Sequence, residues 1–157
     1  MKKVSSKKMK TDADHERLAE LEFKGGLYVN EDMRPILPPE GIKACIVAGA
    51  KKSKEGQIAK AGIWVSDYAL LEYDGPKTAD KLWEDERFRL RNRVKVNQST
   101  IVRTRPIFKE WAATVEVRYN PSICSPEQIL NWLKACGEYG SFDWRPDYGH
   151  FTVAAVE

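Results

Sequence analysis

Residues 87–96, RFRLRNRVKV, constrain the fold most because basic residues alternate strictly with mainly apolar ones. Successive side chains of a β-strand point to opposite faces, so a period of two predicts a strand or one arm of a hairpin. We expect the cations of this segment to share one exposed face: Arg87, Arg89, Arg91, Arg93 and Lys95.

The basic character continues through Arg103 and Arg105. Residues 87–109 include eight basic residues and no acidic one, although the net charge of the whole chain is only +3. Basic residues on an exposed edge strand also protect against aggregation, but that role explains one or two lysines better than a row of arginines. Arginine forms paired hydrogen bonds with phosphate oxygens, so the row predicts contact with a polyanion.

The clearest helix signal lies near the C-terminus, in NPSICSPEQILNWLKACG. Ser125 is placed to cap the helix, Pro126 suits its first position, and Gln128 completes a capping box. We expect residues 127–136 to pack on the core through Ile129, Trp132 and Leu133. Alternating apolar residues predict a strand over 111–119 before this helix and a closing strand over 151–155 after it.

The first half of the chain loosely repeats this order of elements. A helix is predicted after Thr11, another after Pro38 and Pro39, strands near 62–66 and 69–73, and a short helix after Thr78. The pattern predicts an α+β fold of ferredoxin-like type, an antiparallel sheet with helices on one face. We expect a basic flexible tail at residues 1–10 and one domain over 11–157.

The three cysteines, Cys45, Cys124 and Cys136, do not have metal-ligand spacing. Cys45 and Cys136 lie on apolar helical stripes, which favours buried free thiols over disulfides. No apolar run approaches membrane-spanning length, and the N-terminus lacks the apolar core of a signal peptide. We expect a cytoplasmic protein with no membrane partner, no cofactor and no metal.

Residues 140–153, GSFDWRPDYGHFTV, hold the best candidates for catalysis. A lone His150 beside a strand is more typical of a structural role, and Asp143 and Asp147 suit a turn. No phosphate-binding loop, zinc-protease or serine-hydrolase motif is present, so we expect no enzyme. The loop is interpreted as a structural and recognition element: Gly140 and Gly149 allow tight turns or close approach of another backbone, and Arg145 pairs with a neighbouring aspartate or a phosphate.

Several stretches carry a resemblance that covers nearly the whole chain. KKMKTDADHERLAELEFKGGLYVNEDMRPILPPEGIKACIVAGAKKSKEG, YDGP, VRTRPIFKEW and DWRPDYGHFTV resemble a family of uncharacterised proteins of tailed phages and prophages. RPILPPEGIKACIVAGAKK and GSFDWRPDYGHFTV are similar to segments of the RAMP proteins, ferredoxin-like RNA-binding subunits of CRISPR effector complexes. This second resemblance implies a ferredoxin-like fold, RNA binding and assembly into oligomers or filaments.

The sequence therefore predicts a non-catalytic, phage-encoded protein that binds RNA or single-stranded DNA. Its expected binding residues are Arg87, Arg89, Arg91, Arg93, Lys95, Arg103, Arg105 and Arg145. Aromatic residues near the basic run are candidates for stacking on bases: Trp83, Phe88, Phe108 and Trp111. Of these, Trp111 is more typical of a core residue. The alternative is an inhibitor of the anti-CRISPR type, in which the same basic face occupies the nucleic-acid channel of a host defence complex or binds its acidic surface.

Overall fold

The computed structural model describes residues 11–140, 142 and 147–156. The chain forms two compact units, Met1–Ile36 with Leu70–Ala113 and Leu37–Ala69 with Thr114–Glu157. Both units combine helices with small antiparallel sheets, so the α+β class is confirmed. That residues 11–157 behave as a single domain stays a prediction, and the expected tail over 1–10 lies outside the described residues.

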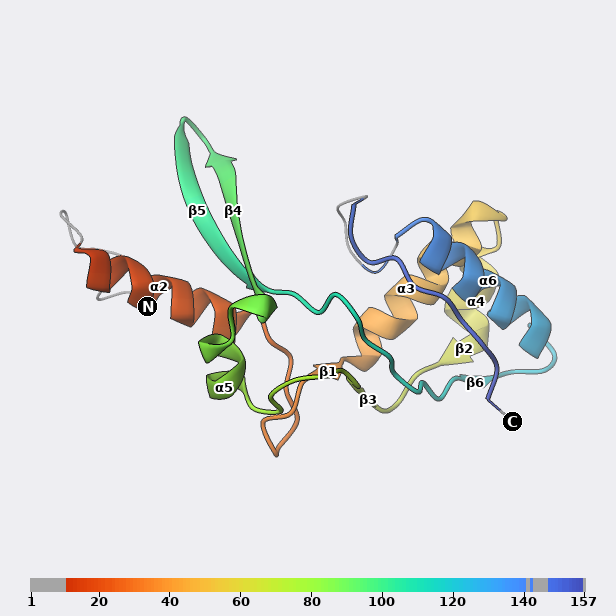
Figure 1. Cartoon of the computed structure of the whole chain (residues 1–157). Coiled ribbons are helices and arrows are strands. Elements are labelled where there is room, and N and C mark those ends of the chain that lie inside the picture. Colours follow the sequence, from red (N-terminus) through yellow and green to blue (C-terminus); the bar gives the residue numbers. More distant parts are fainter. Residues whose placement is uncertain (1–10, 141, 143–146, 157) are drawn as a thin grey trace. The chain divides into compact units, whose positions relative to one another are not determined.

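The first unit is built from two helices and a long hairpin (Figure 1). Helix α2 (Asp12–Gly25) begins at Thr11, whose side chain accepts a hydrogen bond from the Asp14 backbone N–H in a capping box. Helix α5 (Ala79–Glu84) and a 3₁₀ turn, η1 (Glu86–Phe88), lead into strands β4 (Arg89–Val96) and β5 (Ser99–Pro106). Short strands β1 (Ile36–Leu37) and β3 (Ala69–Leu70) pair with each other.

The core of the first unit lies beneath α2, α5 and η1. Phe23, Leu82 and Phe88 are buried at its centre. Partly buried apolar side chains pack around them: Leu27, Tyr73, Trp83 and Phe108. These contacts fix the base of the β4–β5 hairpin to the helices.

The second unit packs three helices with one short sheet. Helix α3 (Pro39–Lys52) has proline at its first position, helix α4 (Gly56–Gly62) follows it, and α6 (Pro126–Glu138) has the predicted Ser125–Gln128 capping box. Strands β2 (Ile63–Trp64) and β6 (Arg118–Tyr119) are antiparallel. The prediction of a helix over 127–136 is confirmed, with Ile129 and Trp132 buried and Leu133 half-buried.

Four of the predicted strands are shorter than expected or absent. The strands expected near 62–66 and 69–73 are reduced to Ile63–Trp64 and Ala69–Leu70. Of residues 111–119, only Arg118–Tyr119 form a strand, and Ala112 makes one isolated bridge to Glu72. Residues 150–156 form no strand; the backbone N–H of Phe151 donates to the Gly137 carbonyl at the end of α6 instead. Alternation of apolar and polar residues predicts an extended backbone, but it does not ensure that a neighbouring strand is available for pairing. Across the described residues the sheets are three two-stranded ones, so the ferredoxin-like arrangement stays a prediction.

The expectation of free thiols is wrong for two of the three cysteines. Cys45 on α3 and Cys136 on α6 form a disulfide, with a Cα–Cα distance of 6.1 Å, and Cys124 is free and buried. The helices approach closely at Gly49, where an added Cβ would lie 2.0 Å from the Trp132 carbonyl oxygen. The apolar stripes of α3 and α6 were predicted correctly. The spacing of residues in the sequence does not reveal that these two stripes face each other.

Glu55, between α3 and α4, forms hydrogen bonds with residues of α6. Its carboxylate accepts hydrogen bonds from Trp132 Nε1 at 2.7 Å, Ser53 Oγ at 2.7 Å and Gln128 Nε2 at 3.2 Å. The bond from Trp132, followed by that from Ser53, lowers the pKa of Glu55 below its ordinary value. The folded state therefore favours the ionised carboxylate.

This depressed pKa predicts a specific pH dependence. A carboxylate with a lower pKa in the folded state stabilises the fold above its unfolded-state pKa of about 4.3, and that contribution is lost as the pH falls below it. Urea unfolding at pH 7 and at lower pH should show a smaller acid-induced loss of stability in Glu55→Gln than in the wild type. Equal acid-induced losses in the two proteins would contradict a role for Glu55.

Candidate nucleic-acid interface

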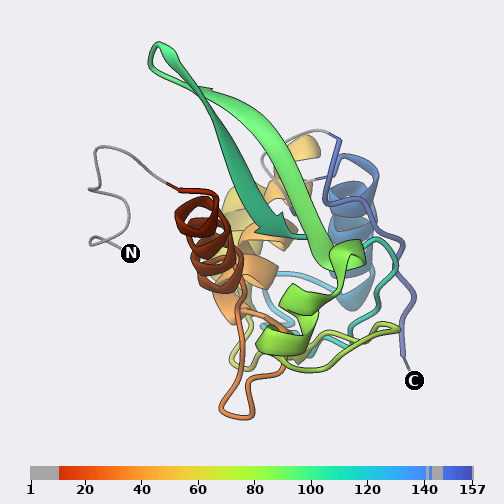
Figure 2. The ribbon, with the colours of Figure 1, turned by 60° about the vertical axis from the view of Figure 1, so that its left-hand side comes forward.

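The basic run forms a regular two-stranded hairpin (Figure 2). β4 and β5 are antiparallel from the Arg89–Pro106 pair to the Val96–Ser99 pair, which leaves Asn97 and Gln98 as the turn. Asn97 has a φ of 55°, a positive value that two-residue hairpin turns require and asparagine tolerates. The sequence predicted a strand or hairpin arm over 87–96, and the part over 89–96 is confirmed.

The predicted row of five cations begins at Arg87, two residues before the strand itself begins. Arg87 lies in η1, because the Asp85 side chain accepts a hydrogen bond from the Arg87 backbone N–H and starts a 3₁₀ turn. Strand alternation places four cations on one face of β4: Arg89, Arg91, Arg93 and Lys95.

Arg103 and Arg105 lie on the opposite face of the hairpin. Residues directly across an antiparallel pair share a face, and Arg103 is opposite Asn92 while Arg105 is opposite Leu90. Both Asn92 and Leu90 alternate with the β4 cations. The predicted binding residues therefore do not form one continuous surface.

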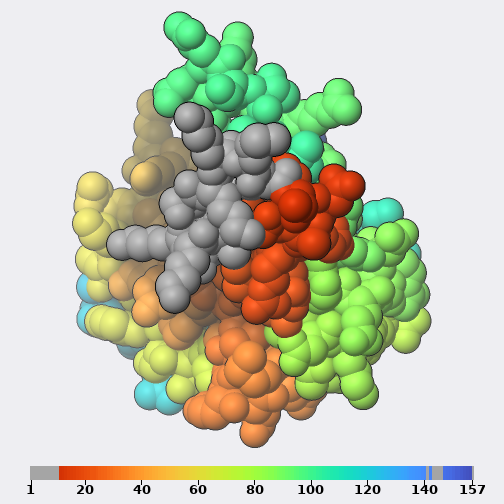
Figure 3. All heavy atoms as spheres, turned by 90° about the vertical axis from the view of Figure 1, so that its left-hand side faces the viewer, coloured from red at the N-terminus to blue at the C-terminus, as the bar shows by residue number. Residues whose placement is uncertain are grey.

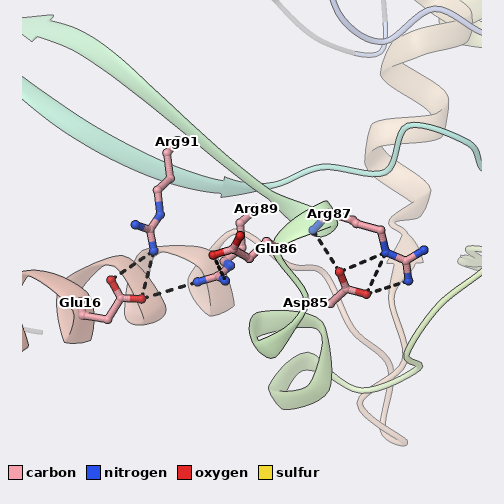
Figure 4. Close-up of polar contacts among 6 residues, drawn as sticks. All are labelled: Glu16, Asp85, Glu86, Arg87, Arg89 and Arg91. Carbon is pink, nitrogen blue, oxygen red and sulfur yellow. Dashed lines mark hydrogen bonds and ion pairs between the residues drawn. The ribbon is translucent and has the colours of Figure 1, made fainter.

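The cations at the base of the hairpin are paired with carboxylates (Figure 4). Arg91 Nη2 donates to the two oxygens of Glu16 on α2 at 3.0 and 3.1 Å. Arg89 lies 3.1 Å from Glu86 and 3.6 Å from Glu16. Its side chain is only 12% exposed, and its guanidinium stacks 4.8 Å from the centre of the Trp83 ring. The expectation that Arg89 is exposed is therefore wrong.

Arg87 is paired separately, with Asp85. Its Nη2 lies 2.8 Å from Asp85 Oδ2. The Arg87 side chain lowers the pKa of the Asp85 carboxyl, and the carboxylate raises the pKa of Arg87. Arg87 remains well exposed, but its charge is already matched.

A second carboxylate of α2, that of Glu22, contacts arginines on the opposite face of the hairpin. Glu22 forms an ion pair with Arg103, lies 3.9 Å from Arg105, and accepts a hydrogen bond from the Thr104 backbone N–H at 3.2 Å. Thr104 is buried, with 1% of its surface exposed. Glu22 thus joins α2 to β5 and neutralises charge near the hairpin base.

The cations in the distal half of the hairpin, unlike those at its base, are not paired with carboxylates of the described residues. The side chains of Arg93 and Lys95 are exposed and form no ion pair or hydrogen bond with any other described residue, although their backbones pair with β5. Figure 3 shows this end of the hairpin, in green, standing beyond α2, in red. These two cations are therefore the ones whose charge is available to an anionic ligand.

Three of the four aromatic residues expected to stack on bases, Trp83, Phe88 and Phe108, pack in the core of the first unit. Phe88 is 7% exposed, and its ring lies 5.5 Å from Tyr73 and 5.5 Å from Phe108. The centres of the Trp83 and Phe23 rings lie 5.5 Å apart, and the Arg89 guanidinium lies over the Trp83 ring. Phe88 lies in the core of the first unit, and the half-buried rings of Trp83 and Phe108 pack against that core, so packing rather than base stacking accounts for these three rings.

The remaining candidates lie in the C-terminal loop. Arg145 and Asp143 lie outside the described residues. Gly140 and Gly149 have φ values of 64° and 75°, a left-handed backbone conformation that glycine adopts readily. His150 Nδ1 lies 3.2 Å from the Gly137 carbonyl oxygen. Among the described residues, no cluster of side chains could hold a metal ion, and no helix is long and apolar enough to cross a membrane.

Comparisons with known proteins give no match to any family model, curated protein or solved structure.

Proposed function

We propose that this chain is a non-catalytic nucleic-acid-binding protein whose β4–β5 hairpin contacts phosphates. The observation that carries the proposal is the pair of exposed, unpaired cations, Arg93 and Lys95, on one face of the distal hairpin. Arg91 adds a third cation on that face, held by the exposed carboxylate of Glu16. Phosphate contacts of this kind give affinity without sequence preference.

The ligand expected from the sequence is RNA or single-stranded DNA, and the resemblance to phage and RAMP proteins is consistent with it. That resemblance, and the ferredoxin-like arrangement it implies, stay predictions. A phage-encoded inhibitor of a host defence complex is the second candidate. It is favoured by Val102, which is 58% exposed and lies opposite Arg93, because apolar surface beside cations suits a protein partner.

Salt dependence tests the proposal directly. Fluorescence anisotropy with labelled oligonucleotides should show affinity falling with salt, with a log–log slope of about −0.7 per phosphate for single strands and −0.9 for a duplex. Two or three contacts predict total slopes of roughly −1.4 to −2.7. A protein that binds no oligonucleotide at low salt would overturn the proposal in favour of the inhibitor.

The paired state of Arg91 gives a further prediction. Glu16→Gln should tighten nucleic-acid binding by up to about tenfold at 0.1 M salt, because it releases one cation for a phosphate contact. An exposed ion pair contributes at most about 1 kcal/mol, so stability should change little. Glu138→Gln, at an exposed carboxylate on α6, is the matched control. Equal affinities for the two variants would show that Glu16 does not limit binding.

A further inference from the structure

The distal part of the hairpin, residues 93–102, is an arm held only by its own strand pairing. Among the described residues, no hydrogen bond or ion pair joins it to another element. Its residues are exposed except for Val94 and Ile101, which pair with each other and are half-buried. The arm extends beyond α2 within the first unit (Figures 2 and 3). Such an element is available to enter a groove.

The chemistry of the arm differs from that of proteins that bind single strands. Those proteins hold successive bases on exposed aromatic rings, but residues 93–102 include no aromatic residue. The tip instead carries hydrogen-bonding side chains, all of them exposed: Asn97, Gln98, Ser99 and Thr100. Amide and hydroxyl side chains are among those that read the edges of paired bases, asparagine and glutamine by paired hydrogen bonds to adenine.

The dimensions of the arm fit the major groove of B-form DNA. A sheet with side chains on both faces is about 10 Å thick, and the groove is about 12 Å wide and 8.5 Å deep. The four residue steps from Arg93 to the turn span roughly 13 Å at strand geometry. The arm can therefore reach the floor of the groove while Arg93 and Lys95 lie at the level of its phosphates.

We infer that the arm enters the major groove of double-stranded B-form DNA, with Arg93 and Lys95 on phosphates and the tip side chains on base edges. This inference rests on the proposed function and narrows its ligand. The major groove of A-form RNA is deep and too narrow for such an element. Duplex DNA is therefore the substrate class, in place of the single strands that the sequence alone predicted.

The inference is tested with three ligands of one base sequence: duplex DNA, the corresponding single-stranded DNA and the corresponding RNA duplex. Their affinities are compared by fluorescence anisotropy at one salt concentration. We expect duplex DNA to bind at least tenfold more tightly than the other two. Equal or tighter binding of the single strand or the RNA duplex would overturn the inference while leaving the proposed function intact. Binding of none of the three would overturn both.

A second comparison identifies the groove. DNA carrying glucosylated hydroxymethylcytosine, which fills the major groove, should bind at least tenfold more weakly than unmodified duplex. Netropsin, a minor-groove ligand, should not displace the protein. Displacement by netropsin, or full affinity for glucosylated DNA, would exclude the major-groove arrangement. Gln98→Ala should weaken discrimination between duplex sequences without changing the salt slope, because it removes a base contact and no charge.

Discussion

The double substitution Arg93→Glu with Lys95→Glu is expected to weaken nucleic-acid binding by more than 100-fold at 0.1 M salt. Affinity varies with salt to a power of about −0.9 per phosphate contact on a duplex, so each contact is worth roughly tenfold near 0.1 M. Loss of two contacts alone gives close to 100-fold, and the new carboxylates add repulsion. The log–log salt slope should become shallower by about 1.8.

Both positions suit this test because neither cation contributes to folding. Arg93 and Lys95 are exposed and lack ion pairs among the residues that the structure describes, so the melting temperature should stay close to that of the wild type. Arg89 is unsuitable, because Arg89→Glu would place a carboxylate beside Glu16 and Glu86.

The matched control reverses two exposed lysines of the second unit, Lys60→Glu with Lys134→Glu, which changes the net charge equally. Fluorescence anisotropy with the same oligonucleotide compares the two double variants. If both weaken binding equally, the overall charge of the protein and not the arm determines affinity. If neither weakens it, the hairpin is not the binding surface.

The hairpin illustrates what the sequence could predict. Strict alternation over residues 89–96 depends only on local geometry, and β4 follows it to the residue. At Arg87 the same alternation fails, because the Asp85 side chain accepts its backbone N–H and favours a 3₁₀ turn. That local competition could have been suspected from the acidic residues directly before the basic run.

The charge balance of the site could not be predicted in the same way. Glu16 and Glu22 lie more than seventy positions before the arginines that they bind, and their effect depends on α2 packing beside the hairpin. A count of acidic residues within 87–109 misses both. The sequence therefore predicted the cations correctly but overestimated how many of them are free.

The cysteines and the missing strands show the same limit. The stripes of α3 and α6 placed Cys45 and Cys136 in the core correctly, but only the packing of the two helices brings them into a disulfide. Alternation over 111–119 likewise predicts extended backbone, and the available partner is β2, which pairs with Arg118–Tyr119 alone. Local patterns thus identified elements and burial, whereas pairing between distant elements required the structure.

Trp132→Ala is expected to lower the free energy of unfolding by about 3–5 kcal/mol, the range for removing a buried large aromatic side chain. Trp132 is 2% exposed and lies on α6 where Gly49 brings α3 close. The truncation would leave a cavity that the disulfide between these helices restrains from closing. It would also remove the indole N–H that donates to Glu55.

Urea unfolding of three variants separates packing from this hydrogen bond. Trp132→Phe keeps most of the buried ring but loses the N–H donor, so its loss should be clearly smaller than that of the alanine variant. Trp64→Ala removes an indole of the same unit that is 48% exposed, and should change stability by less than about 1 kcal/mol. A loss for Trp132→Ala no larger than for Trp64→Ala would contradict the position of Trp132 in the core of the second unit. A loss for Trp132→Phe as large as for Trp132→Ala would assign the effect to the bond with Glu55 and not to burial of the ring.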